Sequence, residues 1–563
     1  MKTFSKSILL LLFGLPLAGQ QAPRIFFSDL ESGPNVGGQN NRGVWVTIWG
    51  KGFGAERRRS NVTVGGGAAA DYPVWSDGKI TFQLGPAAKS GNIVVNLASK
   101  QASNGLPFTV RPGRIFFVAA GGGAAKSSGR QGNDRQKGTY AAPWRTIVHA
   151  KDSMSPGDTT FIEDGVVQSR EDSFTAYLSM DSSGGNNSGK PNAPKALVAY
   201  PGAAATIGVA HGLEYGLRTP NIRAREDYWV ISQLHIIGGR QAIDISATGW
   251  KIVGNQIECP GADGQVGCVE ASQSSRIRFY GNEVHNAGTN PASSKFYHAV
   301  YFSTDSSHID VGWNHIHDNF TCRAVQFHSS PLCSPGCGAN DQTGHNQFDL
   351  HVHDNLIHGD NCNGINFATV DPSRGPVEAY NNVIYHVGAR DPQGGSGAFS
   401  CIYVAGITNH GPEGTGTVEI FNNTLFDCAA NNSGDTDGSR GAVSVGGGPK
   451  SLAVRLRNNI VVQLRGEIYL DGSKAQITGE RNLWFGAGSA PAQTTSNLNV
   501  DPQFLDEARF DFHLRDRSPA RDAGAPVLPN NPLVMGTDQP ADKDGVIRPR
   551  SGAWSLGAYE APK

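Results

Sequence analysis

Residues that can perform acid–base chemistry recur at matching positions in the middle of the sequence. The segment 317–330, HDNFTCRAVQFHSS, alternates apolar and polar residues as a half-buried strand does. Its polar positions are occupied by Arg323, Gln326 and His328. Histidine titrates near neutral pH, and arginine pairs well with carboxylates and sulfates. These residue types therefore predict the floor of a site for an acidic ligand.

Similar residues stand in the neighbouring segments of the chain, and three histidines follow asparagines at one repeated offset. The candidate catalytic residues are His298, Tyr301, Arg323, His328 and Lys295. The candidate substrate-binding residues are Glu270, His285, His317, Gln326, His358, Asn366 and Tyr403. A histidine stack or a surface salt bridge would explain some of them as purely structural.

This combination of residues fits β-elimination on an acidic polysaccharide. Arg323 and Lys295 would neutralise the uronate carboxylate, while His298 or His328 would remove the C5 proton. Tyr301 would then donate a proton to the leaving oxygen. One alternative is a glycoside hydrolase, for which the available carboxylates are Glu270, Asp318, Asp354 and Asp360. A non-catalytic glycan-binding protein or adhesin is the other alternative.

An imperfect repeat must position these side chains. Short apolar strands follow Asn255, Asn282, Asn314, Asn355, Asn382, Asn423, Asn459 and Asn482, at gaps of 27, 32, 41, 27, 41, 36 and 23 residues. Such a period indicates a solenoid, and one asparagine per coil predicts a ladder of side-chain amides. A second strand in each coil has inward apolar pairs such as Val325 and Phe327. Its predicted outward column is Asp244, Glu270, Tyr301, Gln326, Asn366, Tyr403, Ser444 and Tyr469.

The repeat resembles the pectate-lyase-like superfamily of secreted, right-handed, single-stranded parallel β-helices. The resemblance implies an all-β solenoid with a cap at 113–165, coils at 166–485 and a C-terminal capping segment at 486–563. Within the cap, AAPWRTIVHAKDSM predicts a helix that starts at Pro143. The sequence departs from the paired aspartates of polygalacturonases and from the calcium-binding aspartate cluster of pectate lyases. Long insertions at 286–297, 329–348, 387–400 and 427–441 are expected to wall a polymer-binding groove.

The first residues predict export followed by a small β-sandwich. Residues 1–22 combine two lysines, an apolar run and small residues, as a signal peptide does. Residues 23–112 contain short strands separated by turns and resemble an immunoglobulin-like IPT/TIG domain. We therefore expect a secreted protein, extracellular or periplasmic, with a polysaccharide as its partner and a monomeric state.

Composition excludes other classes of protein. The 563 residues carry a net charge of −1, only 17% charged residues, 72 Gly and 31 Pro. This balance provides no basic surface for nucleic acid, and no later segment is long enough to span a membrane. The residues define no metal site and no cofactor, although calcium stays open. Among the eight cysteines, Cys322 and Cys362 are predicted to be adjacent in neighbouring coils, and Cys333 and Cys337 to pair within their loop.

Overall fold

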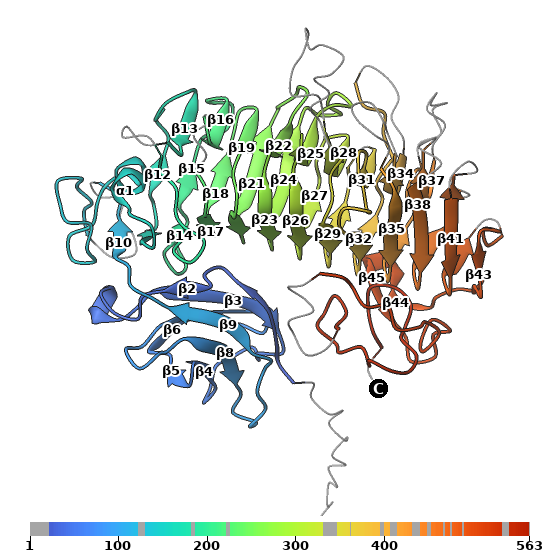
Figure 1. Ribbon diagram of the computed structural model, residues 1–563, viewed down its shortest axis with the longest axis horizontal. Helices are drawn as coiled ribbons and strands as arrows, with labels where there is room; N and C mark the ends of the chain where they lie inside the picture. Colours follow the sequence, from blue (N-terminus) through green and yellow to red (C-terminus); the bar gives the residue numbers. More distant parts are fainter. Residues whose placement is uncertain are drawn as a thin grey trace, which may run out of the picture.

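Three long parallel sheets dominate the computed structural model of the chain (Figure 1). The structure describes residues 22–121, 130–181, 186–220, 226–329, 346–360, 362–393, 399–405, 414–430, 440–446, 452–465, 468–472, 476–486, 489–531 and 540–561. The predicted signal peptide and the predicted Cys333–Cys337 pair lie outside these residues. Each coil contributes one strand to each sheet in turn, so the described chain forms the predicted parallel β-helix.

The strands of the three sheets stack in chain order. The 13-stranded sheet contains β10 (Ile115–Val118), β11 (Thr159–Ile162), β14 (Lys195–Ala199), β17 (Trp229–Ser232), β20 (Lys251–Val253), β23 (Ser275–Tyr280), β26 (Ser307–Gly312), β29 (Leu350–His353), β32 (Val377–Tyr380), β35 (Gly416–Phe421), β38 (Leu452–Arg457), β41 (Gln476–Glu480) and β43 (Thr494–Thr495). The 11-stranded sheet contains β12 (Val167–Gln168), β15 (Thr206–Ile207), β18 (His235–Ile237), β21 (Gln256–Pro260), β24 (Glu283–Gly288), β27 (His315–His317), β30 (Leu356–His358), β33 (Val383–Tyr385), β36 (Thr424–Phe426), β39 (Ile460–Gln463) and β42 (Leu483–Gly486). The 10-stranded sheet contains β13 (Ala176–Ser179), β16 (Tyr215–Arg218), β19 (Gln241–Ile245), β22 (Gly267–Ser272), β25 (His298–Ser303), β28 (Arg323–His328), β31 (Asn363–Phe367), β34 (Phe399–Val404), β37 (Arg440–Val445) and β40 (Leu470–Asp471).

The predicted asparagine ladder runs along the turn between the 13-stranded and 11-stranded sheets. The side-chain amide of each ladder asparagine from Asn255 to Asn459 donates to the side-chain oxygen of the next, at 2.9–3.1 Å. The residue before each asparagine has a positive φ, between 52° and 65°. A bulky residue such as Trp313 rarely adopts this left-handed conformation, so the ladder must hold the turn in place.

The register of the 10-stranded sheet confirms the predicted alternation over most of its length. Backbone pairing aligns Asp244, Glu270, Tyr301, Gln326, Asn366, Tyr403 and Ser444 in one outward column. The prediction is wrong at the last position, because Ser444 pairs with Asp471 rather than Tyr469. Tyr469 is 5% exposed and packs against Trp484 in the core. In the last coil, Leu470 rather than Ile468 is therefore the backbone pairing partner of the inward residue Val443.

A two-sheet sandwich precedes the β-helix. Its sheets have the strand orders β1 (Arg24–Ser28), β3 (Trp45–Lys51), β7 (Lys79–Gln83), β6 (Asp71–Trp75), and β2 (Ser32–Gly33), β9 (Leu106–Val110), β8 (Gly91–Asn96), β4 (Asn61–Val64), β5 (Gly67–Ala68). A short 3-10 helix, η1 (Gln39–Asn41), connects β2 to β3.

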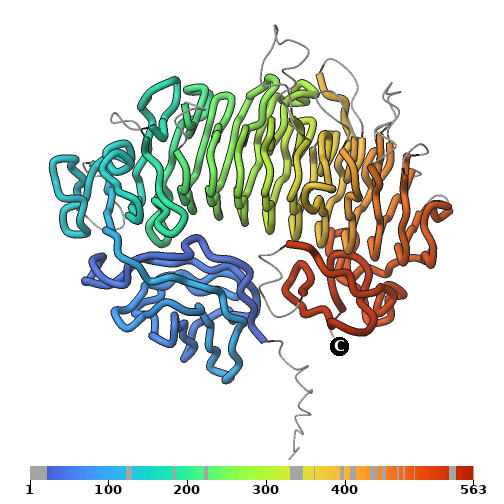
Figure 2. The backbone as a smooth tube through the Cα atoms, viewed as in Figure 1, coloured from blue at the N-terminus to red at the C-terminus, as the bar shows by residue number. Residues whose placement is uncertain are grey.

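The sandwich lies beneath the 13-stranded sheet, beside the C-terminal segment (Figure 2). Its apolar core is continuous with Phe161, Val198 and Val230 on the outer side of that sheet. Farther along, Phe27 contacts the rings of Tyr280 and Trp313 at 5.5 and 5.1 Å. The sandwich therefore shares a core with the solenoid instead of standing apart as a spacer.

A buried ion pair extends this contact. Glu31 of the sandwich accepts from Lys251 at 2.7 Å and from Arg278 at 2.5 Å, although the Lys251 side chain is only 3% exposed. Burial alone would raise the pKa of Glu31, but the charges of Lys251 and Arg278 outweigh it and lower that pKa to about 2. Glu31 therefore compensates a lysine that would otherwise be buried without a counter-charge.

Lys251 and Arg278 belong to one outward column of the 13-stranded sheet, and further charged residues continue that column. Arg278, Asp310, His351 and Glu378 follow one another in register. His351 lies 3.2 Å from Glu378, and on the next column His353 lies 2.8 Å from Asp310. Burial would lower the pKa of both imidazoles. Asp349 and Glu378 outweigh it at His351, and Asp310 and Asp354 outweigh it at His353, so each pKa rises to about 9.

Helix α1 (Ile147–Ser153) covers the first coil of the solenoid. It begins after Thr146, whose hydroxyl accepts from the backbone of His149 at 3.2 Å. The predicted start at Pro143 is therefore too early, since Trp144 is still in an extended segment that bridges to Val118.

The C-terminal segment contains β44 (Phe504–Asp506), η2 (Glu507–Arg509) and β45 (Asp511–Leu514). Phe512 and Leu514 pack on the outer side of the 11-stranded sheet, in a cluster with residues of β33, β36, β39 and β42. This segment therefore lies along the side of the last coils.

Disulfides link strands within one coil and between neighbouring coils. Cys322 and Cys362 are bonded, with Cα atoms 4.7 Å apart, which confirms the predicted adjacency. Cys259–Cys268 and Cys401–Cys428 are also bonded.

Among the described residues, no helix is both long and apolar enough to cross a bilayer.

Asn355→Ala should destabilise the protein more than any substitution of an exposed asparagine. Asn355 donates to Asn382 and to the Val311 carbonyl, and its side-chain oxygen accepts from Asn314. Losing it leaves several buried groups unpaired, so the free energy of unfolding should fall by about 3 kcal/mol or more. Denaturant unfolding measures this loss, with exposed Asn92→Ala as a control expected to stay within about 0.5 kcal/mol. Equal effects of the two substitutions would contradict a stabilising ladder.

Glu31→Ala should weaken the junction between the sandwich and the solenoid. The substitution leaves Lys251 buried without its carboxylate, but Glu31 itself is 43% exposed, so the expected loss is about 1–3 kcal/mol. Thermal and denaturant unfolding should show the loss. Glu56→Ala is the matched control, because the Glu56 side chain is 78% exposed. Unchanged stability in Glu31→Ala would mean that the apolar contacts alone hold the sandwich.

Candidate functional site

Four of the five predicted catalytic residues come together on the outer face of the 10-stranded sheet. His298 and Tyr301 lie on β25, and Arg323 and His328 lie on the adjacent strand β28. The Tyr301 hydroxyl is 3.2 Å from Nδ1 of His328, and the His298 ring meets the Tyr301 ring edge-on at 5.0 Å. Parallel pairing places His298 beside Arg323 and Tyr301 beside Gln326.

Lys295, the fifth predicted residue, contributes its backbone to this cluster. Its carbonyl accepts a hydrogen bond from the Arg323 guanidinium at 2.6 Å. The Lys295 ammonium lies 5.4 Å from the Phe296 ring centre, in the segment that leads into β25. The segment thus fixes Arg323 through its backbone, while the Lys295 ammonium lies over the exposed ring of Phe296.

The imidazole of His298 is held in its neutral form. Its side chain is only 2% exposed, and burial together with the charges of Arg323 and His328 lowers its pKa well below the ordinary value. A neutral imidazole can accept a proton, but the depth of His298 restricts contact with a large substrate. His328 is half-buried and therefore better placed to meet a ligand.

Glu270 and Asp244 form a pair of carboxyls at one end of the column. They are register partners on β22 and β19. Glu270 accepts from Ser303 at 2.9 Å and from Gln241 at 3.0 Å. Burial, aided by the charge of Asp244, raises the pKa of Glu270 to about 7, and burial raises that of Asp244 to about 6. Glu270 therefore exchanges a proton near neutrality.

Amide and phenol side chains continue the column away from Glu270. Asn366 donates to the Gln326 side-chain oxygen at 2.6 Å. Gln326 and Asn366 are 5% and 1% exposed, which is deeper than expected for outward residues. Within the described residues the side-chain oxygen of Asn366 is buried without a hydrogen-bond partner. Tyr403, the next residue in register, is half-buried.

The three predicted ligand-binding histidines do not join this site. His285, His317 and His358 lie on β24, β27 and β30 of the 11-stranded sheet, which is a different face of the coil. Their rings stack at 5.5 and 5.3 Å, and the stack continues to Tyr385 at 4.6 Å. The shared offset after the ladder asparagine reflects this stacking, and their role in substrate binding stays a prediction.

The carboxylates considered for a hydrolase are similarly dispersed. Asp354 lies in the ladder turn and pairs with His353 at 2.7 Å, and Asp318 pairs with His317 at 2.9 Å. Asp360 accepts from Thr321 at 2.7 Å, and burial raises its pKa to about 7. Only Glu270 of this set belongs to the outward column of the 10-stranded sheet.

Two features that could bind a ligand were missed in the sequence analysis. His315 lies beside the histidine stack, and the motif His315-Ile316-His317 was the available signal for it. Cavities of about 450 and 860 Å³ lie where the 13-stranded sheet meets the sandwich, and the first is also lined by the C-terminal segment. No sequence pattern indicates these cavities, since they depend on contacts between distant parts of the chain.

Comparisons with known proteins agree with the two folds. Residues 31–110 match the IPT/TIG domain family, so the N-terminal sandwich is an IPT/TIG domain. No curated protein matches the chain.

Solved structures of similar shape include pectate lyase Pel9A, with 13% identity over 79% of this chain and 96% of that chain and a TM-score of 0.42. XylC in complex with xylose is 10% identical over 79% and 98%, with a TM-score of 0.46. An alginate lyase from Paenibacillus sp. str. FPU-7 is 14% identical over 59% and 95%, with a TM-score of 0.35. At these identities the likeness concerns the β-helix fold and says nothing about the reaction of this chain.

Glu270→Gln should change how stability depends on pH. The folded-state pKa of Glu270 lies above its ordinary value of 4.5, so wild-type protein loses stability as the pH rises from about 4.5 to about 7. The glutamine variant lacks this loss, and its stability relative to wild type should rise by about 3 kcal/mol over that window. Unfolding measured at pH 4.5, 6 and 8 checks the trend.

Glu258→Gln is the control for this experiment. Although burial would raise the pKa of Glu258, its hydrogen bonds with Asn286 and His235 lower it. Wild-type protein therefore gains stability from Glu258 only as the pH rises toward 4.5, and Glu258→Gln should show no rise in stability relative to wild type between pH 4.5 and 8. The same trend in both variants would contradict a raised pKa at Glu270.

Proposed function

We propose that the outer face of the 10-stranded sheet binds an acidic polysaccharide and cleaves it by β-elimination. The observation that carries the proposal is the convergence of Arg323, Tyr301 and His328 on two adjacent strands, with the Tyr301 hydroxyl 3.2 Å from His328. The carbonyl of Lys295 holds the Arg323 guanidinium in place, and its ammonium lies on the same segment. A cationic floor with an acid–base pair matches what elimination from a uronate requires.

Each residue has a distinct role in this reaction. The Arg323 guanidinium, assisted by Lys295, pairs with the uronate carboxylate and makes the C5 proton more acidic. His328 accepts that proton as the general base, and Tyr301 donates its hydroxyl proton to the leaving glycosidic oxygen. His298 stays neutral beneath them and supports the Tyr301 ring. Gln326, Asn366 and Tyr403 extend the floor for further sugar units, with Tyr403 available for stacking.

One observation favours hydrolysis as a second candidate. Glu270 and Asp244 are neighbouring carboxyls on adjacent strands, with pKa values raised to about 7 and about 6. A protonated and an ionised carboxyl are the pair that a glycoside hydrolase uses. In that reaction Glu270 would be the acid and Asp244 the base or nucleophile.

The products of a polysaccharide panel separate these functions. A lyase produces an unsaturated uronate that absorbs in the ultraviolet, a hydrolase produces reducing ends without that absorbance, and a binding protein retains the polymer uncut. We expect the unsaturated product from a polymer rich in uronic acid. Reducing ends alone would overturn elimination and favour the carboxyl pair.

Substitutions in the cluster should then abolish activity without unfolding the protein. His328→Ala should lower kcat/KM by about 100- to 10,000-fold, as expected for loss of a general base. Arg323→Ala should raise KM and lower kcat, and Arg323→Lys should restore part of the binding because it keeps a cation. Unfolding measured beside activity should show a loss of about 1 kcal/mol or less for each.

Two control variants accompany these substitutions. Exposed His211→Ala should retain full activity. Val325→Asp places a charge in the core, where Val325 is 0% exposed, and should unfold the coil. Near-normal activity in both His328→Ala and Arg323→Ala would contradict the proposed roles.

A further inference from the structure

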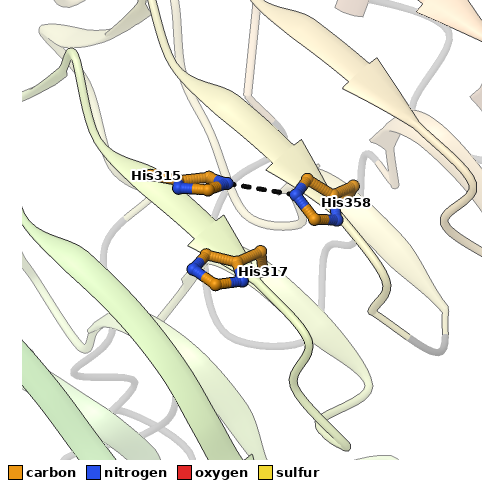
Figure 3. Close-up of side chains that lie close together, drawn as sticks. All are labelled: His315, His317 and His358. Carbon is orange, nitrogen blue, oxygen red and sulfur yellow. Dashed lines mark hydrogen bonds between the residues drawn. The ribbon is translucent and has the colours of Figure 1, made fainter. Parts of the chain in front are cut away.

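We propose that His315, His317 and His358 form a binding site for a divalent transition-metal ion, Zn²⁺ or a similar imidazole-preferring ion, on the outer face of the 11-stranded sheet (Figure 3). One ring nitrogen of each histidine lies within 4.8 Å of the other two. Figure 3 shows the imidazoles of His315 and His358 directed toward each other, with His317 beside them. This site is separate from the cluster on the 10-stranded sheet and does not depend on the proposed reaction.

The strand geometry explains why three ligands meet here. His315 and His317 are two residues apart on β27, so both side chains leave the same face of the strand. His358 is the register partner of His317 on the next strand, β30. Nε2 of His315 and Nε2 of His358 are 3.0 Å apart. Two ligands of a tetrahedral zinc ion are roughly 3.3 Å apart when the Zn–N bonds are about 2.0–2.1 Å long, so this pair is nearly in place.

Carboxylates orient the third histidine. Nδ1 of His317 lies 2.9 Å from Asp318, a contact that can keep a proton on Nδ1 and leave Nε2 to an ion once Glu283 turns toward that ion. Glu283 lies 3.2 Å from that same Nε2 and its side chain is 50% exposed. Glu283 can therefore move to the ion as an oxygen ligand and complete a three-histidine, one-carboxylate set.

The chemistry of the donors selects the class of ion. Imidazole nitrogen suits zinc, copper and nickel, whereas calcium and magnesium prefer oxygen. In the ion-free arrangement the close Nε2 atoms of His315 and His358 must share one proton, because two lone pairs would repel. A bound ion uses both lone pairs at once. The histidines are half-buried, so an ion can enter from solvent.

Untagged full-length protein titrated with Zn²⁺ in a calorimeter tests the site. We expect one ion per chain and, with Co²⁺, the visible bands of tetrahedral coordination. His358→Gln and His317→Gln should each weaken binding by about tenfold or more, and Asp318→Asn by about 10- to 100-fold if its carboxylate orients His317. His211→Gln, at an exposed histidine outside the cluster, should bind as wild type does.

Unfolding experiments provide a second measurement. Zn²⁺ should raise the unfolding midpoint of wild-type protein and of His211→Gln, but not that of His358→Gln. Absence of stoichiometric binding by wild-type protein would overturn the site. Unchanged affinity in both His358→Gln and His317→Gln would also overturn it. Should one variant fail to fold, the other variant and the Co²⁺ spectrum of wild-type protein still decide the question.

Discussion

The side-chain amide of a buried asparagine is the group on which the solenoid depends. It offers two donors and an acceptor, and in this protein these meet the backbone of the turn and the amide of the next coil. The turn contains a residue with positive φ in each coil of the ladder, including Trp313 and Arg481, for which that conformation is unfavourable. Since such strain persists only where other contacts enforce it, each coil needs the amide of its neighbour.

Because the ladder sets how one coil lies on the next, it also decides which outward side chains become neighbours. Tyr301 and Gln326 are 25 residues apart but lie side by side, as do His317 and His358 across 41 residues. Long insertions change the distance along the chain and leave the register intact. A vertical column of this kind can assemble an acid–base cluster on one face and a histidine cluster on another, with no dedicated structure for either.

Much of the fold was predictable because its determinants repeat locally. The ladder asparagines and the inward pairs Val325/Phe327 and Ile365/Phe367 carry the register without help from distant residues. Prediction failed where that pattern is weak, as at Tyr469, whose coil is short and ends the sheet. It also failed for the docking of the IPT/TIG domain, since the contact of Glu31 with Lys251 joins residues far apart in the sequence. The cluster of His298, Tyr301, Arg323 and His328 was predicted as a set. The burial of Gln326 and Asn366 was not predicted, nor was the separation of the stacked histidines onto the 11-stranded sheet.

The charged column of the 13-stranded sheet, on the face toward the IPT/TIG domain, makes the stability of the assembled protein depend on pH. His351 and His353 are cations at neutral pH because their carboxylate partners, Asp349 and Glu378 for the first and Asp310 and Asp354 for the second, hold each pKa at about 9. Their contribution to stability is complete below pH 6.5 and disappears as the pH rises through about 9. Asn531 of the C-terminal segment also binds Asp310, so loss of these cations reaches the capping segment as well. An alkaline medium would therefore weaken the contacts on the face of the 13-stranded sheet that carries the IPT/TIG domain. The side-chain contacts on the other two sheets do not depend on these cations.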